Sequence, residues 1–401
     1  MIPISRRMDD IHSDIRGPLY FKALEMSEKG IPVLRLNTGN PASFGFEMPD
    51  SVRNALYMDP DAAVPYCDSR GMPEARRAIC DYELGKGIKG LTPSDIFVTN
   101  GVSEAAEMLC LALVDPGDEV LCPCPNYSLW SNSVYLAGGR PVFYTCDEQQ
   151  HWNPDIADIK RKITSRTKAL LLINPNNPTG ALYDTEVLKQ ILEVARQHRL
   201  LVISDEIYDR LVFAPKQHVS TATLADDLNV VTFNGLAKSH IICGFRCGWM
   251  AIRGVNGGLN DLRDAIERLA SLRLCSNTLT QLAIPAALED EQSTRDMLSP
   301  EGRLYKQRRA VFDVLDRADG ISYVPNDAAF YLFPRFDAKR FKVTDDRELA
   351  MGLLDKKHIL IVPGSGFDYP YPDHFRIVML PEAHVLSKAT QDMVDYIRSR
   401  E

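Results

Sequence analysis

The middle of the chain alternates short apolar runs with longer stretches in which apolar residues recur at helical spacing. This alternation is typical of βαβ units and predicts a mostly parallel sheet. The runs are apolar throughout rather than at every second position, so both faces of the sheet should be covered by helices. The predicted strands are residues 95–100, 117–125, 168–175, 200–206 and 230–235, and two predicted helices are residues 103–114 and 184–199.

The C-terminal third has a different pattern, which begins near residue 290. Long amphipathic stretches predict helices at 301–318 and 346–357. Apolar segments at 328–336, 359–367 and 374–380 predict strands between and after them. This mixture predicts a smaller α+β domain beside the α/β domain.

Composition and charge exclude several classes of protein. The 401 residues are 45% hydrophobic and 25% charged, which is ordinary for a globular protein with a large core. The net charge of −8 argues against nucleic-acid binding and against docking on anionic membranes. We expect a cytoplasmic protein, because the N-terminus lacks the apolar core of a signal peptide and no apolar run is long enough to span a membrane.

The nine cysteines form neither a disulfide framework nor a zinc motif. Their number is odd, their spacing is irregular, and no CxxC pair occurs. Cys243 and Cys247 are four residues apart, but no second pair follows at zinc-ligand spacing. We interpret the cysteines as reduced and mostly buried, Cys243 and Cys247 as packing residues, and the protein as having no metal site.

Residues that could carry chemistry follow the predicted strands. Ligands of open α/β sheets bind beyond the carboxyl ends of the strands. Each motif there has an ordinary structural explanation on its own: "NPNNPTG" could be a rigid turn, and "DEIYD" a helix start. Six of them in one order are much harder to obtain by chance. They are "NGVSE" (100–104), "PNYSLW" (125–130), "NPNNPTG" (174–180), "DEIYD" (205–209), "GLAKS" (235–239) and "GFRCGW" (244–249).

With these motifs, the chain resembles the class I/II aminotransferases, which are pyridoxal 5′-phosphate (PLP) enzymes of fold type I. The resemblance also includes "LNTGNP" (36–41), "YCDSRGMPEARRAI" (66–79) and "FRIVML" (375–380), and it covers nearly the whole chain. It implies a mostly parallel seven-stranded sheet in a large PLP-binding domain, residues 45–290. It also implies a small domain made of residues 1–44 and 291–401.

The resemblance assigns residues to the cofactor. PLP needs an amine that holds it covalently and later moves a proton, which is the role of Lys238. A carboxylate must face the ring nitrogen so that the ring withdraws electrons, and Asp205 matches that position. Tyr208 and Asn177 match the residues that hydrogen-bond the ring hydroxyl, and Tyr127 matches the one that stacks on the ring.

The phosphate and the substrate also have implied partners. Val102 and Ser103, at a helix N-terminus, and Arg246 match the phosphate-binding residues. Tyr66 matches a tyrosine that reaches the phosphate of the neighbouring subunit, which implies a homodimer with shared active sites. Arg376 matches the arginine that binds the substrate α-carboxylate.

Gly39 and Arg16 complete the implied site. Gly39 fits a backbone segment that lies close to the substrate, where a Cβ would not fit. Three stretches, "SDIRGP" (13–18), "NPASFGFEMPD" (40–50) and "GFDYPYPDHFRIVMLP" (366–381), resemble the bacterial alanine, or glutamate–pyruvate, aminotransferases. Within that branch, Arg16 would bind the distal carboxylate of glutamate or 2-oxoglutarate, or it would only anchor the N-terminal segment.

Three departures from that branch leave other functions open. The branch has a tyrosine where this chain has Ser13, and a serine where it has Ala237; residues 239–243 are also more apolar. A specialised biosynthetic transaminase, or another reaction at Cα such as β-elimination, is therefore an alternative to alanine–glutamate transamination. A non-catalytic ligand sensor is a third hypothesis, but no DNA-binding segment precedes residue 30.

Overall fold

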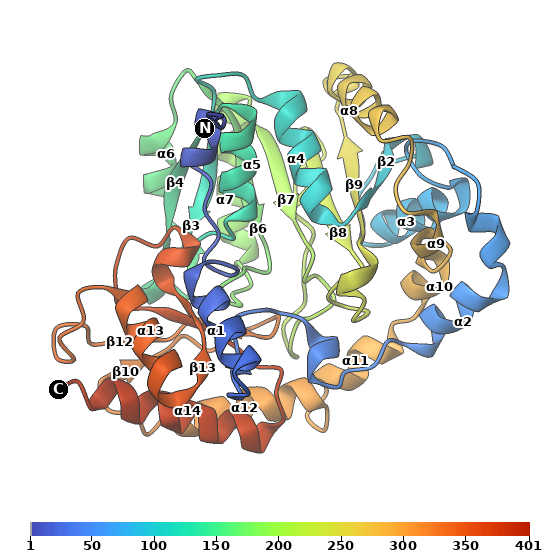
Figure 1. Ribbon diagram of the computed structural model, residues 1–401. Coiled ribbons are helices and arrows are strands. Elements are labelled where there is room, and N and C mark those ends of the chain that lie inside the picture. The colour runs from blue at the N-terminus through green and yellow to red at the C-terminus, as the bar shows by residue number, and fades with distance from the viewer. Residues whose placement is uncertain (1) are drawn as a thin grey trace.

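A computed structural model describes residues 2–401, and its centre is a single eight-stranded sheet (Figure 1). The strand order is β2-β9-β8-β7-β6-β3-β4-β5. The prediction of a mostly parallel α/β sheet is confirmed, with one strand more than the seven expected. The additional strand is β5, only two residues long, which pairs with the end of β4. The strands are β2 (Ile96–Asn100), β3 (Glu119–Cys124), β4 (Arg140–Asp147), β5 (Asn153–Pro154), β6 (Thr167–Ile173), β7 (Leu201–Asp205), β8 (Val230–Gly235) and β9 (Cys247–Arg253).

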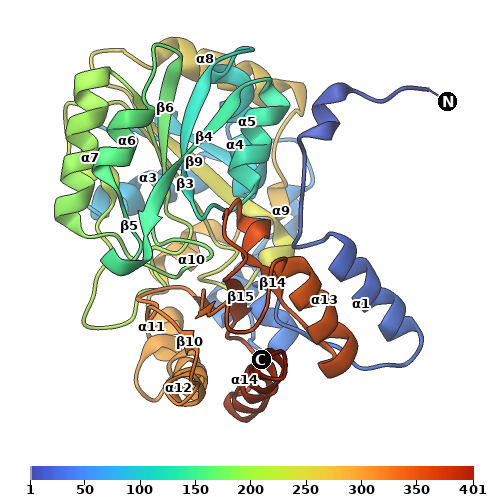
Figure 2. The same cartoon turned by 90° about the vertical axis from the view of Figure 1, so that its left-hand side faces the viewer.

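Helices cover both faces of this sheet. Figure 2 shows α6 (Ile156–Lys162) and α7 (Thr185–His198) on one side of the sheet and α4 (Val102–Leu113) and α5 (Leu129–Ala137) on the other. Successive strand residues point to opposite faces. In β6, Ala169, Leu171 and Ile173 therefore join the core under α4 and α5, whereas Leu170 and Leu172 join the core under α7. This explains why the strands are apolar at every position.

The two faces are completed by helices from the first and third quarters of the chain. On the α7 side lie α3 (Pro73–Gly85) and α10 (Ile284–Glu289), and on the α4 side lies α8 (Asn260–Leu272). Three further helices, α2, α9 and α11, lie beside them or lead to the C-terminal part. Their bounds are Asp50–Met58, Thr278–Gln281 and Gln292–Leu298.

A separate apolar core joins the N-terminal helix to the C-terminal third of the chain. It contains α1 (Pro18–Glu28) and three C-terminal helices, of which α12 and α14 lie side by side (Figure 1). Short strands complete it in three small sheets, with orders β11-β15-β14, β1-β13 and β10-β12. The elements are α12 (Arg303–Leu315), α13 (Asp346–Lys357), α14 (Ala383–Arg398), β1 (Leu34–Arg35), β10 (Ile321–Ser322), β11 (Tyr331–Leu332), β12 (Arg335–Phe336), β13 (Ile359–Leu360), β14 (Val362–Pro363) and β15 (Phe375–Val378).

The strand predicted at 328–336 is two short strands, β11 and β12, that belong to different small sheets. Pro334 lies between them and has no N–H for a strand ladder, so the chain changes partner there. The division into domains at residues 45 and 290 remains a prediction.

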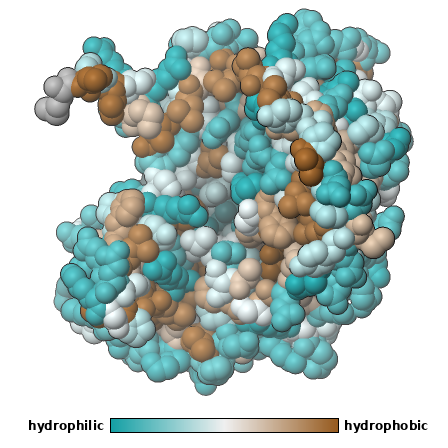
Figure 3. Space-filling view, turned by 45° about the vertical axis from the view of Figure 1, so that its right-hand side comes forward, coloured by the Kyte–Doolittle hydropathy of each residue, from teal (hydrophilic) through white to brown (hydrophobic). Residues whose placement is uncertain are grey.

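The N-terminal segment runs past α5 before it enters α1 (Figure 1). The side-chain amide of Asn132 on α5 pairs with the backbone of His12 in both directions, at 3.3 and 2.6 Å. In Figure 3 brown, hydrophobic residues stand out near the described end of this segment, where Ile2 and Ile4 are 95% and 77% exposed. Among the described helices, none combines the length and the apolar character needed to cross a bilayer.

Candidate functional site

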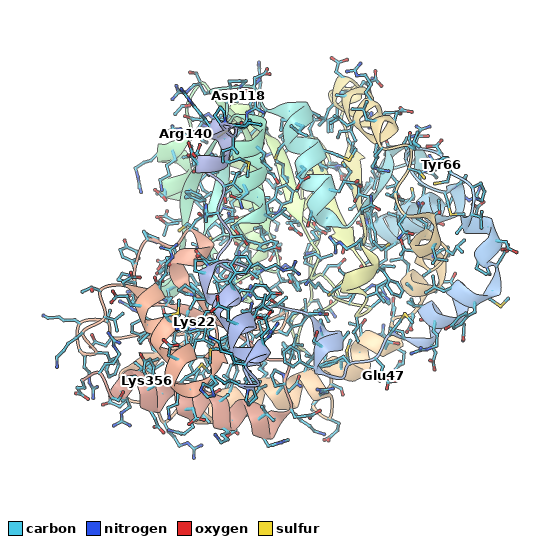
Figure 4. The ribbon with its side chains drawn as sticks, in the orientation of Figure 1. Lys22, Glu47, Tyr66, Asp118, Arg140 and Lys356 are labelled. Atoms are coloured by element: carbon cyan, nitrogen blue, oxygen red, sulfur yellow. The ribbon has the colours of Figure 1, made fainter. Side chains whose placement is uncertain are left out.

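A cavity of about 670 Å³ lies at the carboxyl ends of the parallel strands, between the sheet and the C-terminal part. Figure 4 places Asp118 and Arg140, at the amino ends of β3 and β4, at the opposite end of the sheet. The cavity brings together every predicted site residue except Tyr66. These residues are Arg16, Gly39, Val102, Ser103, Tyr127, Asn177, Asp205, Tyr208, Lys238, Arg246 and Arg376.

Lys238 lies in the turn that follows β8, and its amine reaches into the cavity. Nζ donates a hydrogen bond to the carbonyl oxygen of Gly39, at 2.7 Å. Burial lowers the pKa of this amine, but the nearby groups of Tyr331, Cys243 and Tyr127 outweigh that effect and leave it above its ordinary value. Among residues 2–401, no carboxylate lies within ion-pair distance of Nζ. The Gly39 carbonyl therefore positions the amine, but no negative charge neutralises it.

Only glycine fits at position 39, because aromatic side chains of the protein pack closely against it. A Cβ at this position would overlap the hydroxyl of Tyr331 and lie 2.7 Å from the ring of Phe330. The sequence predicted that a Cβ would not fit here, with the substrate as the neighbour that excludes it. The close neighbours here are aromatic side chains, and they bring the Gly39 carbonyl to Lys238.

Asp205 ends β7 at the floor of the cavity. It is 3% exposed, and Oδ2 accepts a hydrogen bond from Nε1 of Trp130 at 2.8 Å. Oδ1 accepts a second from the backbone N–H of Ile207 at 3.2 Å. Burial raises the pKa of Asp205 to about 6, against the effect of both donors. No cation among residues 2–401 pairs with this carboxylate, so a cationic ligand atom would stabilise its ionised form.

Arg376, on β15, is a buried guanidinium without a counter-ion. It is 1% exposed, Nη1 donates to Oδ1 of Asn177 at 2.9 Å, and Nη2 donates to the carbonyl of Asn37. No group of the described residues accepts a hydrogen bond from its Nε. The guanidinium carbon lies 4.6 and 4.7 Å from the ring centroids of Tyr331 and Phe367, and burial lowers its pKa. In the described part of the chain no carboxylate pairs with it, so the site fits an anionic group from a ligand.

The aromatic side chains of the cavity are linked to each other. The hydroxyls of Tyr208 and Tyr331 are 2.7 Å apart, and their rings meet edge to face. Burial raises the pKa of both Tyr127 and Tyr208, so both hydroxyls stay protonated at neutral pH. In the protein itself Tyr208 bonds Tyr331 and Asn177 bonds Arg376, and the expected hydrogen bonds of Tyr208 and Asn177 to a ring hydroxyl remain a prediction.

The N-terminus of α4 forms one end of the cavity. The first N–H groups of a helix have no partner inside the helix, and Val102 and Ser103 are the first residues of α4. Gly101 and Gly248 allow close packing here, because a Cβ on Gly101 would overlap Arg246 and one on Gly248 would lie 2.6 Å from the N of Val102. The N–H groups and the Arg246 guanidinium together suit a phosphate.

Arg16 and Tyr66 lie at the outside of this arrangement. Arg16 lines the cavity with Ser13, is exposed, and forms no ion pair with any of the described residues. Tyr66 is 78% exposed and lies at the outer edge of the molecule (Figure 4). It does not line the cavity of its own chain.

Three residues of the site were not identified from the sequence. Tyr331 and Trp130 stand in apolar stretches, where an aromatic residue is expected to be core. Cys243 was interpreted as a packing residue, but it lines the cavity, with Sγ 3.8 Å from Nζ of Lys238. Its position five residues after Lys238 was the only signal available. Within residues 2–401, no group of three or more potential metal ligands occurs.

Comparisons with known proteins agree with this arrangement. The family model for aminotransferase class I and II matches residues 31–389. A glutamate-pyruvate aminotransferase of Haemophilus influenzae is 43% identical over 99% of this chain and 98% of its own. An alanine aminotransferase of Mycobacterium tuberculosis is 43% identical over 98% of this chain and 92% of its own.

Solved structures agree on the fold as well. An aminotransferase from Escherichia coli superimposes with a TM-score of 0.97 at 42% identity, over 99% of this chain and 98% of the other. The match of the family model and the identities over nearly full length lead to one conclusion: the chain belongs to the class I and II aminotransferases.

Proposed function

We propose that this aminotransferase uses PLP to move an amino group between alanine or glutamate and the 2-oxo acids pyruvate and 2-oxoglutarate. One observation carries the proposal: the amine of Lys238 and the buried guanidinium of Arg376 face the same cavity, and neither pairs with a carboxylate of the described residues. The names of relatives that are 43% identical over almost the whole chain support these substrates.

The residues present fit PLP, on which enzymes of this family depend. Lys238 would hold its aldehyde carbon. Asp205, which lacks a cation, would face the ring nitrogen, and the α4 N-terminus with Arg246 would hold the phosphate. The close packing at Gly101 supports the last assignment, because the absence of a Cβ lets the Arg246 guanidinium lie next to the start of α4.

PLP, when bound, supplies an electron-withdrawing ring that makes the hydrogen on the substrate Cα acidic. Arg376 binds the α-carboxylate and so fixes Cα next to Lys238. Once the amine of the substrate has displaced Lys238 from the cofactor, Nζ would be free to take the proton from Cα and to deliver it to the cofactor side of the same bond system. Tyr127 would cover one face of the ring, and Tyr208 and Asn177 would donate to its hydroxyl group.

Arg16 is the proposed partner of the distal carboxylate of glutamate. It lines the cavity and lacks an ion-pair partner in the described chain, so it is free to bind an anion. We expect Arg16→Ala to slow the reaction with glutamate at least about tenfold and to leave alanine nearly unaffected. Arg6→Ala is the matched control, an exposed arginine of the same segment that does not line the cavity. Equal losses for both amino acids would leave Arg16 only an anchoring role.

Tyr66 is the proposed contribution of a partner subunit. It is 78% exposed and has exposed apolar neighbours in sequence, Tyr57, Met58 and Val64, at 77%, 83% and 81%. A homodimer would cover these side chains and bring Tyr66 to the phosphate of the other copy. Analytical ultracentrifugation tests the dimer, and mixing Tyr66→Phe with Lys238→Ala subunits tests the shared site. Hybrid dimers should regain activity that neither variant has alone.

A screen of half-reactions tests the proposed function. The purified enzyme with PLP is mixed with single amino acids while the absorbance of the bound cofactor is followed. Alanine and glutamate should give their keto acids and an equal amount of aminated cofactor, whereas valine should react slowly. Release of ammonia without aminated cofactor would indicate β-elimination instead. Turnover by Lys238→Ala at the wild-type rate would contradict the mechanism.

Two coarser features of the proposal concern the whole protein. We propose the division into a large domain, residues 45–290, and a small domain, residues 1–44 and 291–401, which the two separate apolar cores support. We also propose a cytoplasmic location, which agrees with nine free cysteines.

A further inference from the structure

Trp130 is a buried residue behind the cavity that the mechanism above does not use. It is the second residue of α5 and is 1% exposed. Its ring packs edge to face on Phe233 of β8, with centroids 5.0 Å apart. Phe233 pairs in register with Asp205 of β7, so the indole lies over the strand pair that carries the carboxylate.

The indole N–H makes one directed contact. Nε1 donates to Oδ2 of Asp205 at 2.8 Å, and both groups are buried. An indole N–H is only a donor and does not titrate at physiological pH. The contact therefore keeps the same direction over the working pH range, and it favours the ionised carboxylate, as any donor does. With Ile207 N on Oδ1, each oxygen of Asp205 has one fixed donor.

We propose that Trp130 is a positioning residue for the cofactor ring: its N–H holds the Asp205 carboxylate in the orientation in which it pairs with the ring nitrogen. This inference rests on the proposed function, in which Asp205 faces that nitrogen. The effect of Trp130 on the reaction passes through Asp205, since its N–H is committed to that carboxylate.

The chain contains a matched control for this contact. Trp249 is also fully buried, and its Nε1 donates to a buried carboxylate, Oε1 of Glu83, at 3.0 Å. Neither Trp249 nor Glu83 lines the cavity. Trp130→Phe and Trp249→Phe thus remove the same chemical group from equally buried sites, and only one of them is connected to the cofactor.

The test measures binding of two ligands to the apoenzyme by equilibrium dialysis. The ligands are PLP and its 1-deaza analogue, in which carbon replaces the ring nitrogen. Trp130→Phe should weaken PLP binding about tenfold, because it removes a hydrogen bond to a charged group. It should leave binding of the analogue unchanged, because Asp205 has no ring nitrogen to pair with there. Trp249→Phe should change neither.

Turnover gives a second readout. Trp130→Phe should lower kcat about tenfold with alanine and leave KM unchanged, because the substrate carboxylate binds at Arg376 and not at Asp205. If Trp130→Phe does not fold, benzothienylalanine placed at position 130 keeps the ring shape and replaces only the N–H by sulfur. The same selective loss of PLP affinity is expected from it.

Each outcome has a distinct meaning. Equal weakening for PLP and the analogue, or equal effects of Trp130→Phe and Trp249→Phe, would overturn the inference and leave Trp130 a packing residue. Failure of the wild-type apoenzyme to bind PLP would overturn the proposed function instead.

Discussion

Asp205 should make the stability of the apoenzyme depend on pH. The carboxylate is 3% exposed and has two neutral donors but no cation within ion-pair distance in the described chain. Burial raises its pKa from 3.8 to about 6. Because one pKa unit corresponds to 1.36 kcal/mol, this difference is worth about 3 kcal/mol.

The direction of this pH dependence follows from the protonation state of Asp205 that the folded protein prefers. A raised pKa means that the folded protein favours the neutral acid. The stabilisation is complete below the unfolded value of 3.8 and is lost as the pH rises through about 6. Integrated between about pH 4.5 and 7.5, the loss is roughly 2 kcal/mol.

Asp205→Asn removes this titration and keeps the shape of the side chain. Urea unfolding of the apoenzyme between about pH 4.5 and 7.5 should therefore show wild type losing roughly 2 kcal/mol more than the variant as the pH rises. Asp61→Asn, at an exposed carboxylate, is the control for the background titration and should follow wild type. Parallel curves for wild type and Asp205→Asn would refute the reasoning. With PLP bound, the extra dependence should decrease, because a protonated ring nitrogen would stabilise the carboxylate.

Arg376→Lys should raise KM for alanine at least about tenfold, since one ammonium cannot replace a guanidinium that also bonds Asn177; steady-state kinetics with pyruvate formation measure it. His12→Gln should lower the free energy of unfolding at pH 5–6 by less than about 1 kcal/mol and have no effect at alkaline pH. The hydrogen bond to Asp368, at 3.0 Å, raises the pKa of this half-exposed histidine, so its contribution is present below 6.5 and is lost as the pH rises through the raised value. Gly39→Ala should lower the melting temperature and abolish turnover, because its Cβ would displace aromatic residues from Lys238; calorimetry and a turnover assay check both, and normal activity would contradict the packing argument.

Much of this fold could be predicted because apolar runs typical of buried strands alternate regularly with segments in which apolar residues have helical spacing. The predicted strands at 95–100, 168–175 and 230–235 agree with β2, β6 and β8 within two residues at each end. The predicted helix 301–318 is shorter, from Arg303 to Leu315, because periodicity continues into the turns at both ends. The two-residue strand β5 was beyond prediction, since it carries no period and exists only by pairing with β4.

The sequence predicted the site residues whose chemistry requires one residue type. It did not predict the residues whose role depends on how the chain packs. Lys238, Asp205 and Arg376 are charged residues in motifs, and the cavity collects them. Trp130 could not be identified from sequence, because an aromatic residue in an apolar helix is ordinary core, and only the fold brings its N–H to a residue 75 positions away. Whether the N–H or O–H of a buried aromatic side chain makes a functional hydrogen bond depends on residues that are distant in sequence.

The unpaired Nε of Arg376 has a consequence for how the enzyme is handled. We expect a buried cation that no carboxylate of the described residues neutralises to bind small carboxylates that reach it through the cavity. Acetate and formate buffers should therefore compete with the amino acid for Arg376, and a KM measured in them should rise with the buffer concentration. The same property makes small dicarboxylic acids a starting point for inhibitors.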